Sequence, residues 1–413
     1  MLQRSELRPK PFEATNWLKT LMTEYYKELD HASKNKNEKV AWCTSVGPAE
    51  LLLAFGFKIY YPENHGAILG TTRTANTYIP LAHALGYSPE ICSYLTSDIG
   101  AFLKNETPLS KAYGIESVPK PDILVYNTNQ CRDVQEWFSF YARKLGVPIL
   151  GINSPCALDE IEPSHIKDIA DQLQQMKDSL EEISGASFEM NRLKHTISLS
   201  MEGSKLWKAV LNTASHGPSP LTFFDGCIQM APAVCFRGEQ RAIDFYKVLL
   251  TELEERILNG VAAVDEEKFR LYWEGMPIWG KLRQMATLFM ELRTCIVAST
   301  YCNSWIFEML DPTNPFESMA KAYLNIFICR SEAQKEKYII EHIKRFKIDG
   351  VIFHDSKTCP NNSNARYGMP RRLQEDNQIP TLVLDGDLND LSCYSEEQAT
   401  TNIEAFIEQL EGA

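Results

Sequence analysis

The sequence lacks the short patterns that mark nucleotide sites and compact cysteine-based metal sites. Its 413 residues contain no GxxxxGK[ST] and no GxGxxG, so neither a P-loop nor a Rossmann phosphate loop is expected. Its 11 cysteines include no CxxC, which removes the spacings of zinc ribbons, ferredoxin runs and thioredoxin motifs. Any site built from cysteine therefore has to be assembled from distant segments.

The sequence also lacks a basic excess and a long apolar run. The 42 Lys and Arg residues are outnumbered by 54 Asp and Glu, so phosphate-neutralising contacts with nucleic acid are not expected. No run of about 18 uncharged apolar residues suggests a membrane span, and residues 1–12 lack the apolar stretch of a secretory signal. We expect a cytoplasmic protein that binds proteins or small molecules. Because disulfides rarely persist in that compartment, the cysteines raise the question of metal, cluster or catalytic use.

What the sequence does have is a repeated strand, helix, strand pattern. Hydrophobic residues make up 44% and charged residues 23%, and the length suggests two or three domains. Short apolar runs predict buried strands at 121–126, 146–152, 349–353 and 379–384. Amphipathic stretches predict helices at 131–145 and 333–347. Both sets are typical of βαβ units in parallel sheets.

Residues 160–260, which lie between these two regions, have helical periodicity and almost no strand pattern. Helices are predicted at 161–184, 188–214 and 238–259, and a last helix at 396–410 is expected to pack on the second sheet. We therefore predict two α/β domains with Rossmann- or flavodoxin-like parallel sheets, separated by a helical segment. The predicted limits are 1–155, 156–262 and 263–413.

Three cysteines occupy positions that suit ligand binding. Cys131 and Cys359 each follow a predicted strand, and ligands of open parallel sheets bind at the carboxyl ends of strands. Cys92 begins a predicted helix, where free backbone N–H groups favour a thiolate. Three thiolates with one open position would suit an iron–sulfur cluster that binds substrate, but a buried cysteine can equally be a small core residue.

The core interpretation is the one we prefer for seven other cysteines, since free cysteine is among the most buried residue types. They are Cys156, Cys227, Cys235, Cys295, Cys302, Cys329 and Cys393.

Several segments together resemble the benzoyl-CoA reductase and 2-hydroxyacyl-CoA dehydratase family. They run in order over nearly the whole chain, at 41–66, 86–100, 127–137, 273–279, 350–359 and 379–390. The YPEN segment, the DGD turn and the chain length resemble the α subunits of the dehydratases. No single segment is a strong motif, and the indication comes from their common order.

The resemblance implies a heterodimer with a related β subunit and electrons from a separate ATP-hydrolysing iron–sulfur activator. Carried over residue by residue, the family's cluster cysteines fall on Cys92, Cys131 and Cys359. They would hold a [4Fe-4S] cluster whose fourth iron stays open for an acyl-CoA substrate. ATP would enter only through the activator.

Three further residues match family positions or lie close to them. Ser45 and Glu63 match residues near the substrate's hydroxyl or carbonyl oxygen, although a turn serine and a solvated loop carboxylate are equally plausible. His354, five residues before Cys359, is a candidate proton donor, or a hydrogen-bonded core histidine.

Aromatic, acidic and basic residues supply weaker candidates. Trp273, Trp279, Tyr301 and Trp305 would line an acyl or CoA tunnel, although such residues are more often core. Asp385 and Asp387 are expected to cap the following turn. The candidates for binding CoA phosphates are Arg366, Arg371 and Arg372.

The implied reaction is elimination of water from an (R)-2-hydroxyacyl-CoA, lactoyl-CoA or similar, to the 2-enoyl-CoA through ketyl radicals. Acid–base catalysis contributes about 10²–10⁴-fold and does not remove the barely acidic β-proton, whereas one added electron makes that proton much more acidic. Three alternatives stay open. They are a benzoyl-CoA reductase-type subunit, a non-catalytic electron-relay subunit, and an α/β protein without a cofactor.

Overall fold

Two four-stranded sheets form the frame of the molecule in a computed structural model, which describes residues 11–412. The strand orders are β2-β1-β3-β4 and β6-β5-β7-β8, and all neighbours run parallel. The strands are β1 (Val40–Cys43), β2 (Lys58–Tyr60), β3 (Ile123–Asn127), β4 (Ile149–Ile152), β5 (Phe269–Glu274), β6 (Thr294–Ser299), β7 (Gly350–Ser356) and β8 (Thr381–Gly386). The predicted fold class, with two parallel sheets, is confirmed.

The central strands are apolar along their length because both faces of each sheet are covered. Every residue of β1 and β3 is buried. The register pairs Trp42 with Tyr60 on one side of β1 and Cys43 with Val125 on the other. This register sets the carboxyl ends of β1, β2 and β3 side by side.

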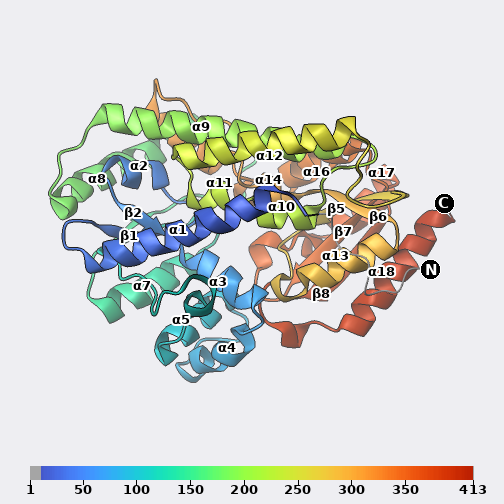
Figure 1. Ribbon diagram of the computed structural model, residues 1–413, viewed down its shortest axis with the longest axis horizontal. Helices are drawn as coiled ribbons and strands as arrows, with labels where there is room; N and C mark the ends of the chain where they lie inside the picture. Colours follow the sequence, from blue (N-terminus) through green and yellow to red (C-terminus); the bar gives the residue numbers. More distant parts are fainter. Residues whose placement is uncertain (1–10, 413) are drawn as a thin grey trace.

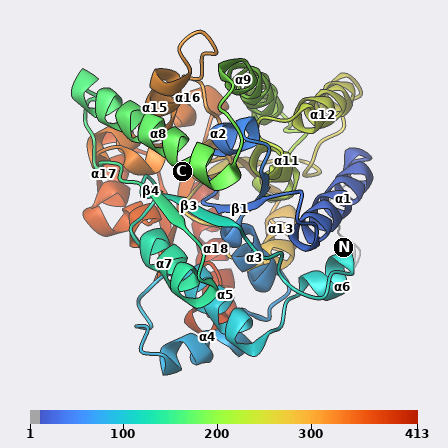
Figure 2. The same ribbon diagram turned by 90° about the vertical axis from the view of Figure 1, so that its left-hand side faces the viewer.

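Helices cover both faces of the first sheet (Figure 2). On one face α7 (Asp133–Leu145) packs against β3 and β4, and on the other lie α2 (Ala49–Ala54) and α8 (Pro163–Ser184). α7 buries its Trp137 side and ends at Gly146, whose φ of +66° is the left-handed conformation that terminates helices.

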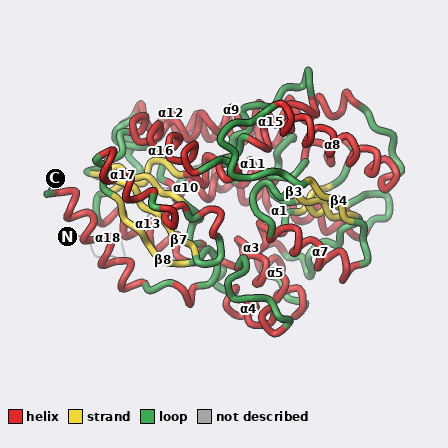
Figure 3. The backbone as a smooth tube through the Cα atoms, turned by 180° about the vertical axis from the view of Figure 1, so that it is seen from behind, coloured by secondary structure: helices red, strands yellow, loops and turns green. Residues whose placement is uncertain are grey.

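The second sheet is covered in the same way (Figure 3). Its helices are α13 (Leu282–Glu291), α16 (Glu332–Phe346), α17 (Met369–Asn377) and α18 (Glu396–Glu411). α13 and α16 pack on β6, and α17 and α18 pack on β8. The predicted packing of the last helix on the second sheet is therefore confirmed.

A helical layer joins the two sheets along one side of the molecule (Figure 1). It contains α9 (Met190–Asn212) and α12 (Gln240–Leu258), which pack on each other, and α1 (Ala14–Lys34) lies against α12. No strand occurs over 160–260, all of which is described, as predicted. One hydrophobic core runs from Val40 of β1 through the helical layer to Ile352 of β7. The domain limits near 155 and 262 stay a prediction.

The remaining helices are short. They are α3 (Pro62–Thr71), α4 (Ala75–Ala84), α5 (Ser93–Lys104), α6 (Leu109–Tyr113), α10 (Phe223–Gln229), α11 (Ala231–Cys235), α14 (Thr300–Asn303) and α15 (Pro315–Leu324). Within the described residues, no helix has the length and apolar character that crossing a bilayer requires.

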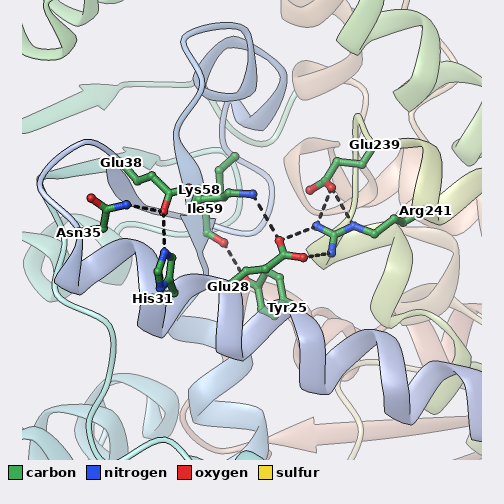
Figure 4. Close-up of polar contacts among 9 residues, drawn as sticks. All are labelled: Tyr25, Glu28, His31, Asn35, Glu38, Lys58, Ile59, Glu239 and Arg241. Carbon is green, nitrogen blue, oxygen red and sulfur yellow. Dashed lines mark hydrogen bonds and ion pairs between the residues drawn. The ribbon is translucent and has the colours of Figure 1, made fainter.

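Polar contacts fasten α1 to the first sheet and to α12 (Figure 4). The Tyr25 hydroxyl donates to the Ile59 carbonyl of β2 at 2.8 Å. Glu28 accepts from Lys58 at 3.3 Å and from Arg241 of α12 at 2.9 Å. These contacts hold α1 in place, and the same helix forms one wall of the cavity described next.

Candidate active site between the two sheets

A cavity of about 620 Å³ lies where the carboxyl ends of the two sheets face each other. From the first sheet it is lined by residues that follow β1, β2 and β3, and from the second by residues that follow β5, β6, β7 and β8. Helices α1, α10 and α11 supply further lining. Ligands bind at this edge of open parallel sheets, so the cavity is the candidate site.

Cys92, Cys131 and Cys359 all line this cavity, although they come from three separate segments. Cys92 immediately precedes α5, Cys131 lies between β3 and α7, and Cys359 follows β7. Each is half-buried. The structure therefore brings the three candidate cysteines to one cavity.

Each of these thiols lies beside backbone N–H groups and beside another thiol. Burial raises the pKa of Cys92, and a Cys131 thiolate would raise it further, while N–H groups of Leu95 and Tyr94 lower it. Burial is the largest cause that raises the pKa of Cys131, and the charges of Asp133 and Cys359 raise it further. The Val134 N–H lowers it. Burial also raises the pKa of Cys359 most, and the charges of Cys92 and Asp387 raise it further. The Asn362 N–H lowers it. These thiols would ionise only when a cation binds them, with release of protons.

The donor set of three thiols can be compared with the needs of a single metal ion and of a cluster. Within residues 11–412, no three His, Cys, Asp or Glu side chains come close enough to share one ion. A cluster takes its thiolates on separate irons, so its ligands stand apart around one space, and N–H groups beside the sulfurs tune it. The donor set is thus suited to an iron–sulfur cluster with three cysteine ligands.

Ser45 and Glu63 face the same cavity and contact each other. The Ser45 N–H donates to both Glu63 carboxylate oxygens, at 3.1 and 2.9 Å, and the Gln130 amide donates to one of them. Glu63 is buried in the first turn of α3, so it is not the solvated loop carboxylate considered above. Burial raises its pKa to about 7, although the hydrogen bonds from Gln130 and Ser45 lower it.

The Ser45 hydroxyl is also not the satisfied turn serine of the alternative interpretation. Its Oγ is buried and has no hydrogen-bond partner within residues 11–412. The side chain lies beside the Glu63 carboxyl, whose pKa it helps to lower, and it faces the cavity.

Gln130 and Arg237 support Ser45 and Glu63, and neither was expected from the sequence. Gln130 directly precedes Cys131, and that position was the available signal. Arg237, which is 2% exposed as a side chain, donates to the carbonyls of Ser45 and Gly47 at 2.9 and 2.5 Å and pairs with buried Glu50 at 3.1 Å. Its role depends on a segment 192 residues from Ser45, so no local pattern could have revealed it.

Aromatic side chains form one wall of the cavity. Trp279, Tyr301 and Trp305 line it, as proposed for a tunnel, and Trp279 bonds the Tyr94 hydroxyl through its indole N–H. Trp273 does not line it. Its ring stacks on Phe223 with centroids 5.4 Å apart, so this residue is core.

His354 and the three candidate arginines do not line the cavity. His354 is fully buried in β7, its Nδ1 lies 2.6 Å from the Met276 carbonyl, and burial lowers its pKa. Arg366 pairs with Asp355 at 2.5 Å, Arg371 with Glu375 at 2.8 Å, and Arg372 with Glu332 and Glu336 at 2.7 Å each. Their charges are therefore already compensated.

Most of the remaining cysteines are buried as predicted. Cys227, Cys235, Cys295, Cys302 and Cys329 are buried, and the first two also line the cavity. Cys156 is exposed, so its predicted burial is wrong, because the loop between β4 and α8 runs over the surface. Cys393 is only half-buried.

The sequence is similar to a known protein family. The family model described as 2-hydroxyglutaryl-CoA dehydratase, D-component, matches residues 44–410. The chain is 30% identical over 404 residues to the (R)-2-hydroxyisocaproyl-CoA dehydratase alpha subunit of Clostridioides difficile, covering 97% of this chain and 96% of that protein.

Two further relatives are similar over most of their length. One is the (R)-phenyllactyl-CoA dehydratase alpha subunit of Clostridium sporogenes, 30% identical over 91% of this chain and 90% of that protein. The other is the lactoyl-CoA dehydratase subunit alpha of Anaerotignum propionicum, 28% identical over 92% of each. The predicted resemblance is confirmed. This chain belongs to the 2-hydroxyglutaryl-CoA dehydratase D-component family.

Proposed function

We propose that this chain is the α subunit of an ATP-activated 2-hydroxyacyl-CoA dehydratase. It would remove water from an (R)-2-hydroxyacyl-CoA, breaking the C2–O bond and releasing a C3 proton, to give the 2-enoyl-CoA through ketyl radicals. The observation that carries the proposal is the meeting of Cys92, Cys131 and Cys359 with Ser45 and Glu63 on one cavity, in a chain of this family.

The three cysteines are proposed to hold a [4Fe-4S] cluster with one open iron. When bound, the cluster would lend one electron to the thioester, take it back, and offer the open iron to a substrate oxygen. The aromatic wall of Trp279, Tyr301 and Trp305 would exclude water and so protect the radicals.

Glu63 and Ser45 are proposed to act on the leaving hydroxyl. A carboxyl with a pKa of about 7 keeps its proton in part of the molecules at neutral pH and can give it to the departing oxygen. The Ser45 hydroxyl, which lies beside the Glu63 carboxyl on the same cavity, would orient that oxygen. Gln130 would hold the Glu63 side chain in position.

The proposed partners are a related β subunit, an ATP-hydrolysing iron–sulfur activator and the acyl-CoA. The relatives are named as alpha subunits, which supports a second subunit. Because the sequence has neither GxxxxGK[ST] nor GxGxxG, ATP is expected to bind the activator. ATP turnover by the purified chain alone would contradict this division of labour.

The first experiment tests the cluster. The chain is purified without oxygen, and its iron, sulfide and EPR spectrum are measured for wild type and for Cys92→Ser, Cys131→Ser and Cys359→Ser. About four irons per chain are expected in wild type, with loss in all three variants. Cys227→Ser is the matched control, because it makes the same change at a cysteine that lines the same cavity. A wild type that stays without iron after reconstitution would refute the proposal.

The second experiment separates the proposed activity from two alternatives, a ring reductase subunit and a non-catalytic electron-relay subunit. With the β subunit and the activator, a dehydratase needs only a catalytic amount of electrons per product, whereas a ring reductase consumes them stoichiometrically. Ser45→Ala and Glu63→Gln should lower the rate while iron content stays unchanged. An electron-relay subunit would tolerate both substitutions.

A further inference from the structure

Asp387 is a fully buried carboxylate at the carboxyl end of β8, directly after Gly386. As expected, it caps its own turn, accepting the N–H groups of Asn389 at 3.0 Å and Asp390 at 2.9 Å. It also accepts hydrogen bonds from outside the turn, which no local sequence pattern predicts. These come from the Ser93 hydroxyl at 2.5 Å, the Thr358 N–H at 2.9 Å, the Thr358 hydroxyl at 2.6 Å and the Ser356 hydroxyl at 3.4 Å.

Two of these donors are the chain neighbours of cluster cysteines. Ser93 follows Cys92, and Thr358 precedes Cys359. The Ser93 backbone N–H also donates to the Thr358 hydroxyl at 3.0 Å, which closes a hydrogen-bonded ring of the three residues. Ser93 lies 294 residues from Asp387 and 265 from Thr358. The ring therefore fixes the segment of Cys92, from the first half of the chain, against that of Cys359, from the second.

Asp387 also brings a negative charge close to the thiols. Backbone N–H groups donate to both of its oxygens. In the described part of the chain no cation pairs with it, since Lys357 and Arg366 of the same loop pair with Glu90 and Asp355. Because Asp387 bonds the chain neighbours of Cys92 and Cys359, its negative charge would lie near a cluster bound there and would disfavour added negative charge on it.

We propose that Asp387 is a positioning residue that sets the spacing of Cys92 and Cys359 and lowers the reduction potential of the cluster they hold. The inference rests on the proposed function, because it needs a cluster at these cysteines. Net charge and hydrogen bonding near the sulfurs are two of the determinants of a cluster's potential. Asp387 supplies the charge directly and supports the geometry through Ser93 and Thr358.

Three variants separate the charge from the positioning. Asp387→Asn removes the charge and keeps the shape of the side chain. Thr358→Val keeps the charge but removes the hydroxyl that joins Ser93 to Asp387. Asp385→Asn is the matched control, because it makes the same chemical change two residues earlier on β8, at an exposed side chain.

The readouts are the midpoint potential, from an anaerobic EPR-monitored redox titration of the reconstituted full chain, and the rate of iron release to a chelator. Asp387→Asn should shift the potential to a more positive value than wild type, while Asp385→Asn should not. Thr358→Val should release iron several-fold faster, with a smaller shift in potential.

The outcomes distinguish this inference from the proposed function. A wild type that never binds a cluster overturns both. A wild type that binds one, with Asp387→Asn unchanged in potential and in iron release, overturns the inference alone. If Asp387→Asn does not fold, Thr358→Val decides, and a wild-type release rate in that variant overturns the positioning role.

Discussion

Replacing Glu63 by Gln should remove part of the pH dependence of the chain's stability. Burial raises the Glu63 pKa from an ordinary value of 4.5 to about 7. Between these values the folded state keeps a proton that the unfolded state has released, so stability falls as the pH rises through this window. At 1.36 kcal/mol per pH unit, the loss is about 3 kcal/mol, complete just above pH 7.

The assay is denaturant unfolding of the cluster-free chain, wild type and Glu63→Gln, at several values from pH 4.5 to 8. The variant minus wild-type difference in unfolding free energy should grow by about 3 kcal/mol over this range and then level off. Glu274, another buried carboxyl whose pKa burial raises to about 7, is present in both proteins and cancels. Glu160→Gln, at an exposed position, is the matched control and should show no such growth.

A flat difference between Glu63→Gln and wild type would refute the reasoning, because Glu63 would then be ionised at the same pH in both states. The same ionisation bears on catalysis. If protonated Glu63 gives its proton to the leaving hydroxyl, kcat/KM should fall about tenfold per pH unit above pH 7. Glu63→Gln should lose that limb of the profile together with most of the rate.

The remaining predictions concern the supports of the site. Arg237→Met should destabilise the chain by about 3–5 kcal/mol in denaturant unfolding, because the Glu50 carboxylate stays buried without its charged partner. Adding Glu50→Gln to this variant should recover much of the lost stability. Strictly additive effects of the two substitutions would contradict the pairing. Trp279→Phe should cost about 1 kcal/mol, because the indole bond to Tyr94 is lost. It should also shift kcat/KM toward bulkier acyl-CoAs, by roughly tenfold, and an unchanged preference would exclude Trp279 from the acyl pocket.

The sequence predicted those helices and strands whose own residues have a clear hydrophobic pattern. β3, β4, β7 and β8 were predicted as short apolar runs, and α8, α9 and α12 followed from helical periodicity. The other four strands, β1, β2, β5 and β6, were not among the predicted ones, and β2 is only three residues long. Strand order was also out of reach, since it depends on pairing between segments far apart in the chain.

The site was predictable only in part, for the same physical reason. Cys131 and Cys359 stand at strand ends, and that placement depends on local sequence and the general behaviour of parallel sheets. Ser45 and Glu63 came from family resemblance, and the buried environment that raises the Glu63 pKa needed the structure. Arg237 reaches the site from 192 residues away, so nothing near it in sequence points to Ser45.

Long-range contacts of this kind tie the site to the docking of the two sheets. Asn389, in the loop after β8, donates a hydrogen bond to the Gly66 carbonyl of α3 at 2.7 Å. Asp387 accepts a hydrogen bond from the hydroxyl of Ser93 in α5. Each bond joins residues more than 290 positions apart, so the cysteines reach their spacing only once both halves have packed. Because a ligand that binds only the folded state stabilises it, a bound cluster would in turn favour the docked arrangement. Cysteine spacing and sheet docking are therefore one coupled property of the chain.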